Sequence, residues 1–122
     1  MVLFHRTTVA GARAIVKHGF RDDRWTFDIR DIRTGEQVTS VGVWLTDRPL
    51  APERGPGGDA MLEVTLGLSE ETLSSFELEG IFADARLWIV PAEIVTPHAK
   101  VRILAVDPGI SGSFGALDGD PI

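Results

Sequence analysis

The sequence predicts a single α+β domain, and three observations lead to this prediction. The chain has 122 residues, which is about the length of one domain. Its apolar segments are short, and several alternate with polar residues or end at Gly and Pro, a pattern typical of strands. These segments follow one another as sequential hairpins, with helical periodicity in few places. We therefore expect about six or seven strands and two short helices.

The first strand and the first helix are predicted from adjoining segments. Residues 2–4 form a short apolar run of β-favouring residues that ends at His5. Thr7 or Thr8 can cap a following helix, and Gly19 can end it. Between them, apolar residues recur at the spacing of one helical face: Val9, Ala12, Ile15 and Val16. We expect this helix to span residues 8–18.

The middle of the chain predicts a hairpin followed by a loop. Residues 25–29 alternate apolar and polar side chains, Thr34 and Gly35 form a turn, and residues 37–45 make the returning strand. The alternation slips between Ile29 and Ile32, which predicts a β-bulge. Residues 49–58 then hold three prolines and three glycines in ten positions, too many for regular structure.

The remaining segments complete the predicted domain, which we assign to residues 1–106. Ser69 can cap a short helix whose first turn is acidic. Residues 107–122 hold four glycines and two prolines with few large apolar side chains, so we expect a weakly ordered tail there. The predicted strands are residues 60–66, a short edge strand at 76–78, residues 87–90 before Pro91, and residues 100–106.

Composition excludes several classes of function. The chain is 43% hydrophobic and 25% charged, as in ordinary globular proteins. The absence of cysteine excludes disulfides, zinc–thiolate sites and thiol nucleophiles, and it fits a reducing compartment. No apolar run approaches the ~18–20 residues of a membrane span, and the start does not resemble a signal peptide, so we expect a cytoplasmic protein with no membrane partner. The net charge of −6 argues against nucleic acid as a partner.

Most candidate chemistry in the sequence has an ordinary structural explanation. The three histidines lack metal-ligand spacing, so we expect no metal site. The glycine-rich segment 55–59 lacks the Lys-Ser/Thr and the helix of a phosphate-binding P-loop, although its mobility would suit a lid over a cleft. His5 is the exception. It lies where the first strand ends and the first helix begins, a junction where a side chain and backbone amides can face a ligand.

Several motifs together resemble the ADP-ribosyltransferase superfamily, and within it the diphtheria-toxin and poly-ADP-ribose-polymerase branch. The similarity spans residues 2 to about 106. It implies a split β-sheet of two packed, mainly antiparallel halves. The segments that carry it are His5-Arg6-Thr7, Lys17 to Phe20 at the end of the helix, Gly42 to Asp47, Leu62-Glu63-Val64, and Trp88 to Ile94.

The resemblance implies that NAD is the substrate and that it lies in a cleft bounded by His5, Trp44 and the loop 49–58. His5 would bond the adenosine ribose, the backbone of Arg6 would hold the nicotinamide amide, and Thr7 would support the histidine. Trp44 would stack on nicotinamide, a contact that suits an indole face. The alternative for Trp44 is that it covers a core, because Val43 and Leu45 share the other face of the strand.

Two positions depart from the family pattern. Arg6 stands where the family has a glycine that lets the ligand approach, so its side chain must swing clear. Leu87 stands where the catalytic glutamate is expected, and the loss of such an electrostatic contact costs about 10²–10³ in rate. Glu93 is our candidate acid in its place; the other acids near in sequence are Glu77, Glu79 and Asp84. Arg86, next to the substituted position, suits a phosphate.

The sequence therefore leaves three functions open. The first is an NAD-binding protein that transfers ADP-ribose to a protein or small-molecule acceptor, or hydrolyses NAD. The second is a catalytically inactive protein-interaction module on the same fold, which Leu87 favours. The third is an enzyme similar to the RNA 2′-phosphotransferases, which would use His5, Arg6 and Arg86, although the short chain and its negative charge count against it.

Overall fold

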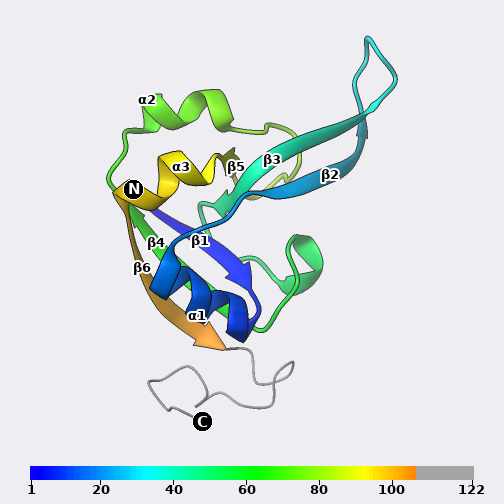
Figure 1. Ribbon diagram of the computed structural model, residues 1–122. Helices are drawn as coiled ribbons and strands as arrows, with labels where there is room; N and C mark the ends of the chain where they lie inside the picture. Colours follow the sequence, from blue (N-terminus) through cyan, green and yellow to red (C-terminus); the bar gives the residue numbers. More distant parts are fainter. Residues whose placement is uncertain (107–122) are drawn as a thin grey trace.

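The computed structural model describes residues 1–106, so the predicted tail at 107–122 lies outside the described residues. Figure 1 shows the arrangement of the elements. Within this range no helix combines the length and the hydropathy that a membrane span requires. The strands are β1 (Val2–Thr7), β2 (Asp23–Arg30), β3 (Gln37–Thr46), β4 (Ala60–Leu66), β5 (Leu87–Val90) and β6 (Ala99–Val106). The α-helices are α1 (Val9–His18), α2 (Glu70–Leu73) and α3 (Ala92–Val95).

The described strands form one antiparallel sheet, which confirms the α+β class. The strand order is β2-β3-β1-β4-β6, and β5 pairs with β3. β1 pairs with β4 along its whole length, from Val2 opposite Thr65 to Thr7 opposite Ala60. In contrast, β1 meets β3 at a single pair, Phe4 opposite Thr46. Strand pairing therefore continues along the whole of β1 on the side of β4. On the other side, β1 and β3 are paired at one residue pair and are separate elsewhere.

Helix α1 begins and ends where the sequence predicts. The Thr8 side chain caps it by accepting a hydrogen bond from the backbone N–H of Gly11 at 3.0 Å. Gly19 ends it with a φ of 89°, a conformation that glycine adopts without strain. Ala12 is buried on the face that packs against the sheet. The cap and the terminator thus fix α1 directly after β1.

Strands β2 and β3 form a hairpin that projects from the body of the molecule (Figure 1). We call β2, β3 and the connecting residues 31–36 the hairpin arm. The pairing shifts between Thr26 and Arg30, so an irregularity is present in this hairpin, but it begins earlier in β2 than the predicted slip between Ile29 and Ile32. At the tip, the Asp31 carboxylate accepts hydrogen bonds from the backbone N–H groups of Arg33 and Thr34.

Three short segments differ from the prediction. Residues 76–78 do not form a strand, because a 3₁₀ turn at Ser74–Phe76 precedes a single bridge between Glu77 and Trp88. The loop 49–58 contains a 3₁₀ turn at Pro52–Arg54. After β5, α3 and a further 3₁₀ turn at Thr96–His98 occupy a segment for which the sequence predicted no element. Such one-turn helices are too short for a 3.6-residue period to be visible in the sequence.

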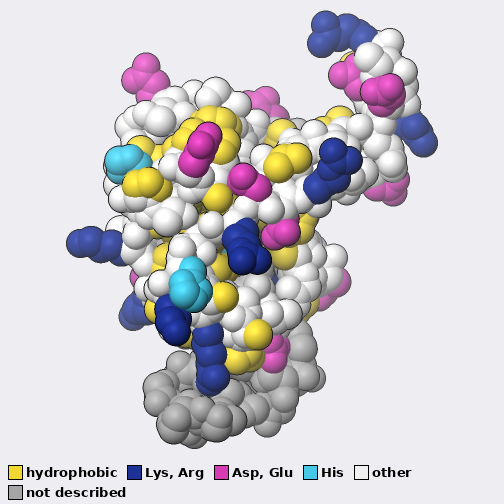
Figure 2. All heavy atoms as spheres, in the orientation of Figure 1, with side chains coloured by type: hydrophobic (Ala, Val, Ile, Leu, Met, Phe, Trp, Pro, Cys, Tyr) yellow, Lys and Arg dark blue, Asp and Glu magenta, His cyan; other side chains and the backbone are white. Residues whose placement is uncertain are grey.

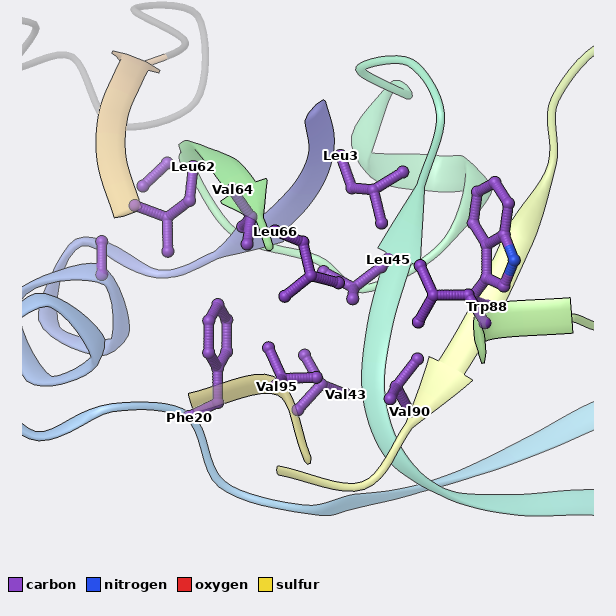
Figure 3. Packing of buried hydrophobic residues seen from close by; sticks show 13 residues of the cluster. Leu3, Phe20, Val43, Leu45, Leu62, Val64, Leu66, Trp88, Val90 and Val95 are labelled. Carbon is purple, nitrogen blue, oxygen red and sulfur yellow. The ribbon is translucent and has the colours of Figure 1, made fainter. Parts of the chain in front are cut away.

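Two apolar clusters lie on opposite faces of β3 and β5, because successive side chains of a strand alternate in direction. Figure 3 shows the first cluster, which contains Val43 and Leu45 of β3 together with Trp88 and Val90 of β5. The second cluster consists of Phe27, Trp44, Leu87 and Ile89, with partly buried neighbours that include Trp25 and Phe82. Each of the two strands therefore contributes to both clusters.

Candidate functional site

Two adjoining hollows meet at His5. The first lies between α1 and the start of β2 and has a volume of about 330 Å³; its other walls include Ile15, His18, Phe20 and Arg21. The second, also of about 330 Å³, lies between the start of α1, the start of β2 and the loop at Pro56 and Gly57. Both are lined by His5, Thr7 and Asp23. We call the pair the β1–β2 groove.

The groove exists because β1 and β2 join β3 at different points. Phe4 of β1 lies opposite Thr46, whereas Asp23 of β2 lies opposite Gly42. Between these two junctions His5 bridges to β3 through its side chain, with Nδ1 2.7 Å from the backbone oxygen of Trp44. The imidazole of His5 thus connects β1 to β3 beyond the residue pair at which their strand pairing ends.

The contact with Trp44 defines the state of the His5 ring. A carbonyl oxygen can only accept, so Nδ1 carries the proton and donates it. His5 is 8% exposed, and burial lowers the pKa of its ring below the ordinary value, although the Trp44 carbonyl and the charge of Asp23 oppose this shift. Near neutral pH the ring is therefore neutral, and Nε2 has a lone pair that can accept a hydrogen bond from a hydroxyl group.

Trp44 does not share a hollow with His5, in contrast to the expectation from the sequence. It is 7% exposed and belongs to the second cluster. Its indole is stacked on Phe27 at 5.7 Å and meets Trp25 and Phe82 edge-on at 5.1 and 6.1 Å. Gly55 of the loop covers it so closely that an added Cβ would lie 2.8 Å from the ring. Trp44 therefore fills and covers a core, the alternative that the alternation of β3 had left open.

Trp25 is the aromatic side chain that lines the second hollow, and Phe20 lines the first. Its Nε1 donates to the backbone oxygen of Gly42 at 3.0 Å, which fixes the ring at the start of the hairpin arm. The sequence analysis did not single out Trp25 as a site residue. A signal was present in the neighbouring polar run Arg21 to Arg24, which an aromatic residue follows directly.

The Arg6 side chain turns away from His5 and holds the loop 49–58. Its Nε donates to the backbone oxygen of Leu50 at 3.2 Å, and its Nη1 donates to that of Gly58 at 3.1 Å. Arg6 is 9% exposed. The loop is thereby fastened to the end of β1, so the guanidinium has a structural role in addition to any contact that the Arg6 backbone makes with a ligand.

Thr7, at the end of β1, is in close contact with both α1 and the loop 49–58. An added Cβ at Gly11 of α1 would lie 2.3 Å from the Thr7 hydroxyl oxygen, and one at Gly58 would lie 2.3 Å from the Thr7 carbonyl. Both glycines are therefore required for α1 and the loop to pack against the end of β1. Thr7 lines both hollows together with His5.

Arg86 and Glu93 are not brought to His5. Arg86 makes a bidentate pair with Glu77 and a further pair with Glu70, and these carboxylates raise the pKa of its guanidinium. Its guanidinium also lies 4.7 Å from the Trp88 ring centre. Glu93 is exposed on α3 and lines neither hollow of the groove. The positions of these side chains therefore do not support the assignment of Arg86 or Glu93 to the site.

Leu87, at the position expected for a catalytic glutamate, is 1% exposed within the second cluster. It lies opposite Thr46 in β3. Trp44 lies two residues before Thr46, opposite Ile89, and so shares the same face of the sheet. A carboxylate there would be desolvated among apolar groups. Leu87 and Trp44 therefore belong to the same apolar face of β3 and β5, and this face is a core.

The groove contains cations and one acid. Arg21 lines the first hollow and Arg24 the second, and within residues 1–106 neither has an ion-pair partner. In Figure 2 basic side chains gather over α1, which carries Arg13, Lys17 and His18. The N-terminus of α1 is less available to an anion, because the Asp59 carboxylate already accepts from the backbone N–H of Val9 at 3.1 Å. Asp23 is the acid in both hollows.

A larger hollow of about 570 Å³ lies elsewhere, between Asp47 and the segment 77–86. The cations that line it are paired with acids: Arg86 pairs with Glu77 and Arg48 lies 3.6 Å from Asp47, while the Asp84 carboxylate accepts from Arg54, which lowers the pKa of Asp84. We therefore do not assign the site to it. Among residues 1–106, no three His, Asp or Glu side chains gather closely enough to hold a metal ion.

Comparisons of the chain with protein-family models, with curated proteins and with solved structures found no match.

Proposed function

We propose that the β1–β2 groove binds NAD. The observation that carries this proposal is the meeting of two adjoining hollows at a buried, neutral histidine. A dinucleotide consists of two nucleosides joined by a diphosphate, and each hollow is at the lower end of the ~300–1,000 Å³ range of ligand sites. One continuous ligand with two lobes is the shape that suits such a groove.

The side chains of the groove suit the parts of NAD. Nε2 of His5 accepts a hydrogen bond from a ribose hydroxyl, because Nδ1–H is already donated to Trp44. Trp25 offers an indole to the nicotinamide ring in place of Trp44, with cation–π attraction to its positive charge. Arg21 in the first hollow and Arg24 in the second offer guanidinium groups that can bind the diphosphate.

Titration with NAD, followed by calorimetry and by intrinsic tryptophan fluorescence, tests this proposal. We expect saturable binding to the wild-type chain, and an affinity about tenfold lower in His5→Ala and Trp25→Ala, equivalent to about 1.4 kcal/mol each. His98→Ala is the control for His5→Ala, because His98 is exposed on the Thr96–His98 turn. Trp44→Phe is the control for Trp25→Ala, since it alters an aromatic ring outside the groove.

Two outcomes would contradict NAD binding in this groove. The first is the absence of saturable heat and of any fluorescence change with the wild-type chain. The second is an affinity that falls in Trp44→Phe while Trp25→Ala binds normally. That result would mean that nicotinamide contacts Trp44 of β3 and not Trp25. Circular dichroism of each variant establishes that it is folded before its affinity is compared.

The activity of an RNA 2′-phosphotransferase is less well supported than NAD binding. Such an enzyme would need the guanidinium groups of Arg6 and Arg86 to face the same phosphate as His5. The Arg6 guanidinium instead bonds the loop 49–58, and that of Arg86 pairs with Glu70 and Glu77.

One observation favours the protein-interaction module as a second candidate function. The hairpin arm projects into solvent (Figure 1), and Ile32 at its tip is fully exposed, at 101%. Figure 2 shows basic and acidic side chains gathered around this tip. Protein interfaces have an apolar centre and a polar rim, and Ile32 among charged side chains would suit the edge of such a contact. An NAD titration without any response would leave this module as the better supported function.

A further inference from the structure

The proposed NAD site lacks a negative charge at the position that the family resemblance predicts. Leu87 lies there, buried in the second cluster. Departure of nicotinamide from NAD leaves positive charge on the ribose, and only a nearby anion or dipole can stabilise it. His5 does not supply this charge, because its ring is neutral or cationic in every protonation state.

Asp23 is the one carboxylate that lines either hollow among the residues that the structure describes. It opens β2 opposite Gly42, at the edge of the gap that His5 bridges. Its charge reaches the His5 ring, where it partly offsets the effect of burial on the pKa. Within residues 1–106 it has no ion-pair partner, so no cation in direct contact neutralises its charge.

The neighbouring Asp22 differs in each of these respects. Its carboxylate accepts a hydrogen bond of 2.7 Å from the backbone N–H of Ala92, so it joins the start of β2 to α3. It lines neither hollow. The two adjacent acids therefore have separate roles, one structural and one directed into the groove.

We propose that Asp23 is the catalytic carboxylate of an NAD glycohydrolase, an inference that rests on the binding of NAD in the β1–β2 groove. The bond between C1′ of the ribose and the nicotinamide nitrogen breaks, and its electron pair stays on nicotinamide, which leaves neutral. Asp23 bonds a ribose hydroxyl and stabilises the cation that forms. Water then adds to C1′ and releases a proton, so NAD⁺ and water give ADP-ribose, nicotinamide and H⁺.

The exposure of Asp23 favours water as the acceptor. The side chain is exposed at the mouth of the groove, so water reaches C1′ from the same side. Exposure also weakens the effect of a charge, because solvent screens it. We therefore expect the loss of the Asp23 charge to lower the rate by about 10², the lower end of the range for a single electrostatic contact.

The test measures two quantities in three chains: nicotinamide released from NAD, by chromatography, and NAD affinity, by calorimetry. Asp23→Asn removes the charge from the groove. Asp22→Asn is the matched control, because it removes the same charge one residue away and keeps an oxygen that can accept from Ala92. We expect about 10²-fold slower release in Asp23→Asn, with affinity within about threefold of the wild type, and unchanged release in Asp22→Asn.

The outcomes separate the two proposals. If the wild-type chain binds NAD but releases nicotinamide no faster than buffer does, the catalytic role of Asp23 is wrong and NAD binding stands. The same conclusion follows if Asp23→Asn releases nicotinamide at the wild-type rate, or if both variants slow equally. If the wild-type chain does not bind NAD, the proposed function is wrong, and the role of Asp23 fails with it.

Discussion

At the scale of single residues, the direction of one side chain decides between two roles for the same residue type. Trp44 and Trp25 are 5.1 Å apart and in edge-on contact, yet Trp44 is enclosed by aromatic rings and the loop, whereas Trp25 reaches the groove. The alternation of Val43, Trp44 and Leu45 correctly predicts that Trp44 lies on the other face from its neighbours. It does not predict what covers that face, because the cover comes from β2 and the loop.

The same limit explains which site residues the sequence analysis found. His5 was identified from its place between a strand and a helix, and it lies in the groove. Asp23 and Trp25 were not identified, because their meeting with His5 depends on where β2 pairs with β3. Arg86 and Glu93 were assigned from their nearness to Leu87 in sequence, and the structure directs them to Glu77 and to solvent.

The buried state of His5 predicts a pH dependence of stability. Its pKa in the folded chain is below the 6.5 of an unperturbed histidine, chiefly because of burial. As the pH falls through about 6.5, the unfolded chain therefore binds a proton before the folded chain does, and the free energy of unfolding decreases. Above that pH both states are neutral at this ring, and the contribution is constant.

Urea unfolding at about pH 7.5 and pH 5.5 measures this effect. We expect the free energy of unfolding to fall between these two pH values by more in the wild-type chain than in His5→Asn. Asparagine does not titrate, and its amide can still donate to the Trp44 carbonyl. An equal fall in the two chains would show that His5 titrates alike in the folded and unfolded states.

At the scale of elements, the sequence predicted best what is capped or strongly alternating. Helix α1 has Thr8 and Gly19 at its ends, and β4 lies at Ala60–Leu66 as predicted. Helix α3 was missed, because four residues after Pro91 carry no readable period. Its position depends on a tertiary contact, the hydrogen bond from the backbone N–H of Ala92 to Asp22, which lies 70 residues away in sequence.

The loop 49–58 closes on β1 through one glycine, and this predicts an asymmetric pair of substitutions. Gly58 has a φ of 122°, and an added Cβ would lie 2.3 Å from the backbone of Thr7. Gly57, its neighbour, has no atom within 4 Å of such a Cβ. Gly58→Ala should therefore displace the loop and destabilise the chain by about 1–3 kcal/mol, whereas Gly57→Ala should change stability by less than about 0.5 kcal/mol.

Denaturant unfolding of the two variants measures this difference, and limited proteolysis reports on the loop. Gly58→Ala should be cleaved faster within residues 49–58, because the Arg6 bond to the Gly58 carbonyl is lost when the loop shifts. Equal stability and equal cleavage of the two variants would mean that the loop does not rest on Thr7. NAD affinity should decrease in Gly58→Ala alone, since Gly57 and Pro56 line the second hollow and a displaced loop would move them away from it.

At the scale of the whole molecule, the two apolar clusters are joined by shared strands. β3 contributes Val43 and Leu45 to the first cluster and Trp44 to the second, while β5 contributes Trp88 and Val90 to the first and Leu87 and Ile89 to the second. A strand cannot leave one cluster and remain in the other. The hairpin arm projects from the body, but its β3 strand continues into both clusters (Figure 1).

This sharing predicts that residues 1–106 unfold in one cooperative transition. Trp88→Phe leaves fluorescence from Trp25 and Trp44, which report on the second cluster, and the double variant Trp25→Phe with Trp44→Phe leaves Trp88, which reports on the first. Because each variant has its own stability, fluorescence and far-ultraviolet circular dichroism are compared within the same variant. The two signals should share one urea midpoint in each. A variant whose fluorescence changes at lower urea than its circular dichroism would show that one cluster opens while the other persists, and that the strands common to both do not couple them.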